Sequence, residues 1–191
     1  MEQKRGLFIV FEGIRESGKG TQMINLAGHV RSLDEGQDII LTHGSWKNMT
    51  DKDIVAHSED IDSRLNDGYF VFCELYKMSN CANQWTRGND LFKLFRMYDG
   101  QRIIKPDLNI FMDISAETSE KRRTNRGENK QDFREFKFAK ELVSHYSNLA
   151  NRIDSKDLFG LVESVNGREE VNEVFEKVKS VFEGVYQKWK S

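Results

Sequence analysis

A glycine-rich loop near the start of the chain constrains its fold more than any other feature. Gly13 is followed five positions later by Gly18 and then by Lys19, which is the spacing of a phosphate-binding P-loop. Residues 7–11, before the loop, form a continuous apolar run, as expected of a strand buried on both faces. After the loop, apolar residues recur at helical spacing, at Met23, Leu26, Ala27 and Val30. The loop therefore lies between a buried strand and an amphipathic helix, where a phosphate site requires it.

The residue types in this loop fit the chemistry of a phosphate site. Gly13 and Gly18 can adopt backbone angles that a Cβ would forbid, so successive N–H groups turn toward an anion at the positive end of the following helix. Lys19 can then reach the β- and γ-phosphates. Gly20 stands where a Ser or Thr usually follows the lysine, and spacing alone does not assign the Thr21 hydroxyl to a metal or to a phosphate. The alternative interpretation is a strand–turn–helix that merely has glycine in its turn.

Length, charge and cysteine content limit the classes of protein to which this chain can belong. A chain of 191 residues suits one α/β domain with a full core. The net charge of −2 gives no general attraction to nucleic acid or acidic membranes, and no apolar run is long enough to span a bilayer. Residues 1–5 lead directly into the first predicted strand, so we expect no secretory signal. We interpret Cys73 and Cys81 as reduced thiols of a cytoplasmic protein.

Apolar segments alternate with helical patterns along the whole chain. Strands are predicted at residues 7–11, 38–42, 69–73, 107–113 and 159–165. Helices are predicted at about 19–32, 75–88, 90–102, 133–153 and 170–188, with another beginning after Ser115 as its cap and one or two short ones within 48–67. This alternation predicts an α/β fold, in which helices connected by right-handed crossovers cover both faces of a parallel sheet.

Two further segments are candidates for the same site. Glu74 follows the third predicted strand and would lie at the edge of the P-loop if the strands are parallel. A carboxylate there can hold Mg²⁺ through water or orient an acceptor group; the alternative is a solvated acid at a strand end. Residues 121–130 are the most basic stretch of the chain and contain a glycine. We favour a mobile lid that closes over a triphosphate, rather than a solvated helix end, for this stretch.

Several segments follow one another in the order of a known family's motifs. Residues 8–22 match its opening strand and loop, 72–84 its Asp-Arg-Tyr segment, 105–113 its next strand, 126–135 its arginine-bearing lid and 165–171 its adenine-side turn. In this order and spacing the chain resembles the thymidylate kinase family, a group of P-loop nucleoside monophosphate kinases. The resemblance implies a P-loop NTPase fold, a three-layer α/β/α sandwich with a five-stranded parallel sheet. It also implies a single domain of residues 1–191 with a lid at about 122–135, the cofactors ATP and Mg²⁺, and pairing of two copies as a homodimer.

The loop and the resemblance together name the residues of the expected site. The expected catalytic residues are Lys19, Arg15, Glu74 and Arg126. The residues expected to bind ATP are Gly13, Glu16, Ser17, Gly18, Lys19, Gly20, Thr21, Arg122 and Asn166. The expected metal-binding residues are Thr21 and Glu74. Because phosphoryl transfer relies on positioning and charge, the cationic side chains would neutralise the transferred group while Mg²⁺ bridges the β- and γ-oxygens.

The departures from the family pattern concentrate on the acceptor side. Leu75 replaces the arginine that the resemblance assigns to the monophosphate or the transferred group, and Arg15 and Glu16 stand in the loop in reversed order. The segment 48–67 looks short, and Arg64 is its only arginine. The family keeps a long helix there, with an aromatic residue and an arginine for thymine and its phosphate. The sequence therefore supports chemistry on the ATP side better than on the acceptor side.

Three functions are compatible with these observations. The first is transfer of the γ-phosphoryl group of ATP to a nucleoside monophosphate, with dTMP as the preferred candidate. The second is a catalytically impaired, nucleotide-binding protein with a non-enzymatic or regulatory function, which Leu75 and the short segment before the third predicted strand favour. The third is a deoxynucleoside kinase, since such enzymes carry a Glu-Arg pair that Glu74 echoes. In all three the partners are small-molecule nucleotides, and we expect neither nucleic acid nor membrane as a partner.

Overall fold

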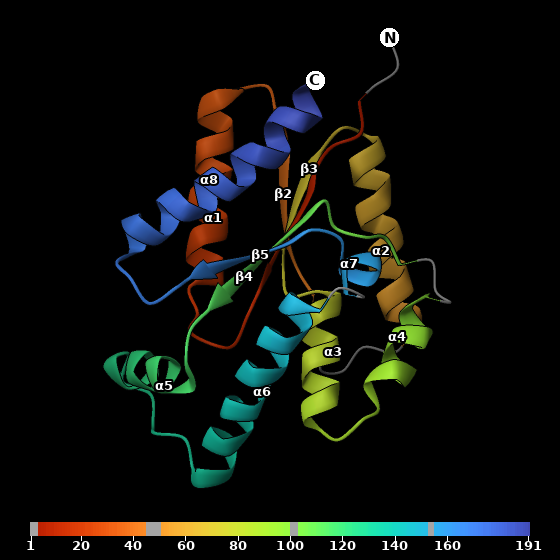
Figure 1. The fold of residues 1–191 in the computed structure, drawn as a ribbon. Helices are drawn as coiled ribbons and strands as arrows, with labels where there is room; N and C mark the ends of the chain where they lie inside the picture. The colour runs from red at the N-terminus through yellow and green to blue at the C-terminus, as the bar shows by residue number, and fades with distance from the viewer. Residues whose placement is uncertain (1–3, 45–50, 100–102, 153–154) are drawn as a thin grey trace.

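A computed structural model describes residues 4–44, 51–99, 103–152 and 155–191, and within these ranges one parallel sheet forms the centre of the molecule (Figure 1). Its strands are β1 (Phe8–Glu12), β2 (Ile39–His43), β3 (Phe70–Glu74), β4 (Leu108–Asp113) and β5 (Val162–Asn166). They lie in the order β2-β3-β1-β4-β5, and every neighbouring pair is parallel. β1 is central and buried along its whole length, whereas the edge strands β2 and β5 are partly exposed.

Helices cover both faces of this sheet (Figure 1). The described helices are α1 (Lys19–Leu33), α2 (Asp51–Asn66), α3 (Lys77–Thr86), α4 (Leu91–Asp99), α5 (Ala116–Asn125), α6 (Phe133–Asn151), α7 (Ser155–Phe159) and α8 (Val171–Lys190). On one face, α1 and α8 contribute Leu26 and Phe182 to a hydrophobic cluster that includes Ile9 of β1. On the other face, a second cluster joins α2, α3, α4, α6 and α7 to Phe8 of the same strand. The three layers confirm the predicted α/β/α sandwich.

Two elements differ from the predictions made from sequence. A single helix, α2, covers residues 51–66, where one or two short helices were expected. Its buried residues Ile54, Ile61 and Leu65 are spaced for one helical face, but the polar residues between them weaken that signal. Likewise, residue 159 ends the short helix α7 and does not begin a strand. Gly160 follows with a φ of 78°, and a Cβ there would lie 2.4 Å from the Pro106 carbonyl oxygen, so this turn delays β5 to Val162.

The parallel arrangement gathers the carboxyl ends of the strands at one edge of the sheet. The register pairs Phe11 of β1 with Glu74 of β3, so the end of β3 lies beside the start of the P-loop, as predicted. Open α/β sheets bind their ligands at this edge. In Figure 1 it faces the lower part of the molecule, away from both chain termini.

Two further expectations concern the cysteines and the membrane. Cys73 and Cys81 are both buried free thiols, in agreement with the interpretation from sequence. Across the described residues, no helix combines the length and the apolar character that a bilayer span needs.

Candidate active site

The P-loop, residues 13–18, connects the end of β1 to the start of α1. Gly13 has a φ of 135°, and a Cβ there would lie 2.8 Å from the carbonyl oxygen of Met112 in β4, so only glycine fits. Gly18 has a φ of 92° directly before α1. Glu16 also has a positive φ, 60°, which is uncommon for a residue other than glycine and concentrates at functional sites. The loop backbone is therefore held in a strained, specific shape at the positive end of α1.

Lys19 turns its side chain back over this loop. Only 5% of the residue is exposed, and its Nζ donates hydrogen bonds to the Ile14 carbonyl oxygen at 2.8 Å and to Ser17 Oγ at 3.3 Å. The Glu74 carboxylate lies 3.7 Å from the same nitrogen. Burial lowers the pKa of Lys19, and the nearby carboxylates, Glu74 foremost, oppose that shift. The ammonium group is thus poised at the loop, beside the carboxylate predicted for the same site.

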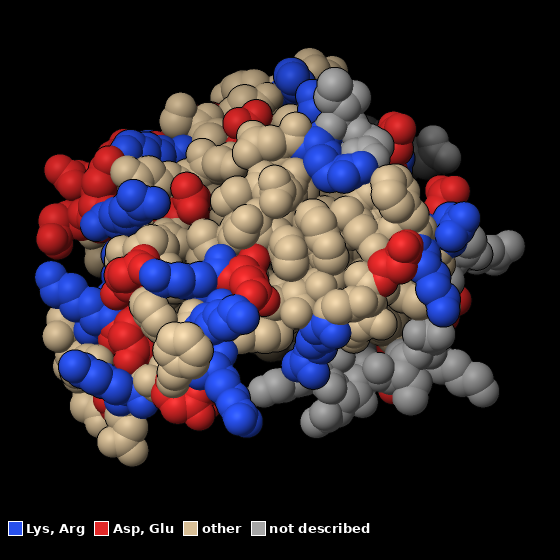
Figure 2. Space-filling view, turned by 60° about the horizontal axis from the view of Figure 1, so that its bottom comes forward, with Lys and Arg blue, Asp and Glu red and all other residues tan. Residues whose placement is uncertain are grey.

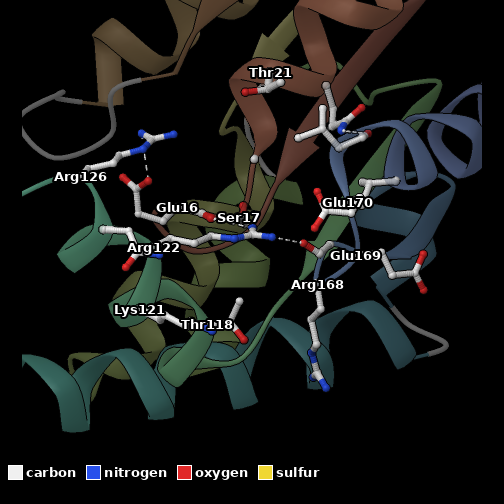
Figure 3. A pocket seen from close by; sticks show the side chains of 16 residues that line it. Glu16, Ser17, Thr21, Thr118, Lys121, Arg122, Arg126, Arg168, Glu169 and Glu170 are labelled. Carbon is white, nitrogen blue, oxygen red and sulfur yellow. Dashed lines mark hydrogen bonds and ion pairs between the residues drawn. The ribbon is translucent and has the colours of Figure 1, made fainter.

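A first cavity of about 510 Å³ opens on one side of the P-loop, between α1, α5 and the turn before α8 (Figure 3). Arg122 of α5 lies across it. Its guanidinium donates to the carbonyl oxygens of Glu16, at 3.0 Å, and Gly167, at 2.7 Å. The cavity is lined by Glu16, Ser17, Gly18, Thr21, Gln22, Thr118, Lys121, Arg122, Asn125, Arg126, Gly167, Arg168, Glu169, Glu170, Val171 and Val174. Because the start of α1 and four cationic side chains line this cavity, against three glutamates, it suits an anionic ligand.

Crossed ion pairs join the P-loop to the segment after α5. Arg15 lies 3.0 Å from the Glu128 carboxylate, and Arg126 lies 3.0 Å from the Glu16 carboxylate. Two adjacent loop residues of opposite charge thus pair with two residues of opposite charge across the gap; we call these contacts the crossed ion pairs. Over the face shown in Figure 2, basic and acidic side chains of the described residues are likewise interspersed, with no patch of a single sign.

A second cavity, of about 490 Å³, opens on the other side of the P-loop. α3 contributes a polar face to it, and α6 contributes Leu142 and Tyr146. The remaining wall comes from the P-loop and from the carboxyl ends of β2 and β3, where Leu75 adopts a left-handed φ of 65°. The lining residues are Gly13, Ile14, Arg15, Lys19, His43, Gly44, Glu74, Leu75, Ser79, Asn80, Asn83, Gln84, Arg87, Leu142 and Tyr146. Two cavities of similar size thus flank one loop, with Lys19 and Glu74 on the second.

The structure brings most of the site residues predicted from sequence to this edge and divides them between the cavities. The first cavity receives Glu16, Ser17, Gly18, Thr21, Arg122 and Arg126, and the second receives Gly13, Arg15, Lys19 and Glu74. Thr21 and Glu74, which were predicted together as metal ligands, therefore line different cavities. Gly20 lines neither, but a Cβ there would lie 3.2 Å from a Glu74 carboxylate oxygen, so Glu74 approaches the backbone after Lys19.

Asn166, like Gly20, is a predicted residue that lies outside both linings. Its amide nitrogen donates to Glu169, and its amide oxygen accepts from the Arg168 backbone N–H. These contacts shape the turn between β5 and α8. Gly167, the next residue, lines the first cavity and accepts the hydrogen bond from Arg122.

Sequence reasoning missed most of the second cavity's polar wall. Asn80, Asn83 and Gln84 of α3 and Arg87, the residue directly after it, recur at helical spacing, which was the available signal. Glu12 was also missed. It stands at the end of an apolar strand and reads as the last strand residue, yet it is completely buried, and burial raises the pKa of its carboxyl to about 7.

Comparisons with known proteins all identify similarity to the same family. The sequence profile of a family described as thymidylate kinase matches residues 49–178. A thymidylate kinase of Caldicellulosiruptor saccharolyticus is 25% identical over 96% of this chain and 99% of its own length. One from Dictyostelium discoideum is 24% identical over 97% of this chain and 88% of its own length. The crystal structure of a thymidylate kinase from Ehrlichia chaffeensis superposes with a TM-score of 0.67 at 17% identity, over 93% of this chain and 99% of that one, which shows a shared fold.

Proposed function

Because the chain belongs to the thymidylate kinase family, we propose that it transfers the γ-phosphoryl group of ATP to dTMP, giving ADP and dTDP. The observation that carries this proposal is the pair of cavities on either side of the P-loop, each of the size of a nucleotide site. A kinase of this kind must hold two nucleotides with their phosphates facing one another, and a loop between two cavities provides that arrangement.

On the donor side, we assign ATP to the first cavity and its phosphates to the loop. The backbone N–H groups of residues 13–18 and the positive end of α1 would hold the phosphates, with Lys19 turning from Ile14 toward the β- and γ-oxygens. Arg122 and Arg126 line this cavity and would neutralise phosphate charge. Thr21 lines it too and offers a hydroxyl to a phosphate.

On the acceptor side, we assign dTMP to the second cavity. An oxygen of its phosphate attacks the γ-phosphorus, the bond from that phosphorus to the bridging oxygen breaks, and ADP leaves. Arg15 and Lys19 line this cavity and would stabilise the charge that spreads over the transferred group. This assignment gives Arg15 the task of the arginine that Leu75 replaces.

The donor atoms at this edge fit a magnesium ion bound with ATP. Mg²⁺ in phosphoryl-transfer sites takes one or two carboxylates and completes its shell with phosphate oxygens and water. Glu74 supplies a carboxylate beside Lys19 and the Gly20 backbone, so Glu74 would hold the ion. The bound ion supplies neutralisation of the β- and γ-oxygens.

The proposal extends to the domain organisation, the cellular location and the oligomeric state of the protein. We treat residues 1–191 as one kinase domain, with a lid at about 122–135 whose arginine, Arg126, already contacts the P-loop. We expect a cytoplasmic enzyme, as the free thiols favour. We also expect two copies to pair as a homodimer, and sedimentation of the purified protein measures that state.

The deciding experiment is ADP release from Mg²⁺-ATP with a panel of nucleoside monophosphates and nucleosides. Turnover that is fastest with dTMP supports the proposal, and the Lys19→Met variant serves as the inactive control. Faster turnover with thymidine than with dTMP would replace the proposal by a deoxynucleoside kinase. ATP binding with no turnover on any acceptor would replace it by a regulatory, nucleotide-binding function.

A further inference from the structure

Glu12 joins the donor loop to a helix that lies far away in the sequence. It is the last residue of β1, immediately before Gly13 of the P-loop, and none of its surface is exposed. One carboxylate oxygen accepts a hydrogen bond from the Tyr76 backbone N–H at 3.0 Å, and the other accepts from the Ser79 hydroxyl. The Tyr146 hydroxyl of α6 donates to the same Ser79 oxygen at 2.7 Å. A single buried carboxylate thus ties together β1, α3 and α6.

The contacts of Glu12 complete the start of α3. The first N–H groups of a helix have no partner within it, and a polar side chain just before the helix usually accepts from them. α3 lacks such a side chain of its own, because Tyr76 stands at the capping position and makes no capping hydrogen bond. Leu75, before it, has a left-handed φ of 65°. Glu12 takes the place of the missing cap from another element, and its carboxylate lies at the positive end of the helix.

The helix held in this way is the wall of the second cavity. Ser79, Asn80, Asn83 and Gln84 of α3 all line it, whereas Glu12 lines neither cavity. The same residue that fixes α3 is bonded directly to the first residue of the P-loop. A displacement of α3 relative to the loop would therefore change the distance between the two nucleotides without changing the loop itself.

We infer that Glu12 is a positioning residue for the acceptor: by capping α3 and holding Ser79, it sets the acceptor wall against the P-loop without touching either nucleotide. This inference rests on the proposed function, because it assumes that the second cavity holds the acceptor. Because Glu12 is the side chain of β1 that holds α3, its loss should weaken acceptor binding and leave ATP binding nearly unchanged.

The test uses Glu12→Gln, which keeps the shape of the side chain, and Glu12→Asp, which keeps its charge but is shorter by one methylene. Glu163→Gln, an exposed position on β5, is the matched control. Loss of a charge-assisted hydrogen bond predicts a KM for dTMP raised about 10-fold in both variants, while the Kd for ATP, titrated without acceptor, stays within about 2-fold. Equal changes in both constants, or no change in either, would overturn the inference.

Amide hydrogen exchange tests the cap without any turnover. The amides of residues 76–80 are expected to exchange faster in Glu12→Gln than in the wild type, while those of α1 keep their rates. If the wild type turned over no acceptor, the proposed function would fail, yet faster exchange confined to α3 would still support the cap. Exchange rates in α3 equal to those of the wild type would refute it.

Discussion

Releasing Arg15 from its carboxylate partner should tighten ATP binding. Glu128 lies 3.0 Å from Arg15 and 3.2 Å from Arg123, so Glu128→Gln removes the charge that holds Arg15 away from a phosphate. Arg123 keeps Glu120 as a partner, at 3.7 Å. The substitution therefore leaves Arg15 with only its longer contact to Glu16, at 3.8 Å, and leaves Arg123 paired.

The expected change in ATP affinity follows from the solvent exposure of the Arg15 side chain. The Arg15 side chain is 64% exposed, and ion pairs in such positions contribute about 0.2–1 kcal/mol. ATP no longer has to compete with that pair, so its Kd should fall by up to about 5-fold. The same loss lowers the free energy of unfolding by no more than about 1 kcal/mol, or about 2–4 °C in Tm for a chain of this length.

Calorimetric titration of ATP at low ionic strength measures this change. At about 1 M salt the Debye length falls to about 3 Å, and the difference between variant and wild type should shrink. Glu141→Gln is the control, since Glu141 pairs with Lys137 within α6, away from the loop. Unchanged or weaker ATP binding by Glu128→Gln would show that the crossed ion pairs do not compete with the phosphates.

Three further outcomes are expected. Lys19→Met should lower kcat/KM by about 100- to 1000-fold in the ADP-release assay, and a loss below tenfold would count against a phosphate-binding lysine. Asn109→Ala should cost about 1–3 kcal/mol in a thermal melt, because buried Asn109 donates to the Phe159 carbonyl oxygen at 2.6 Å; an unchanged Tm would refute this. Burial raises the pKa of Glu12 from 4.5 to about 7, so over this range the unfolded chain has lost a proton that the folded one keeps. The wild type should therefore lose stability relative to Glu12→Gln as pH rises through that window. Lys19 and Tyr146 are titratable groups that interact with the Glu12 carboxyl. A difference in Tm that stays constant with pH would contradict the prediction.

Much of the fold could be predicted because its signals are local. The strand before Gly13, the loop and α1 occupy consecutive residues, and glycine angles, apolar runs and helical spacing each depend only on near neighbours. The cap of α5 is of the same kind, since Ser115 accepts from the Thr118 backbone N–H. α7 was not predicted because it is five residues long and ends just before Gly160, whose turn lies against the distant Pro106.

The features of the site also separate into those that depend on local sequence and those that depend on tertiary contacts. The sequence by itself determined the residues of the phosphate loop, the parallel sheet and the acid at the end of β3, because these depend on chain order and residue type. Only the tertiary structure decided that Thr21 and Glu74 line different cavities, that Arg15 pairs with Glu128, and that Glu12 accepts a hydrogen bond from the Tyr76 backbone N–H. Each of these relations joins residues on separate elements, and no local preference specifies which buried carboxylate or exposed charge a folded chain will bring to its partner.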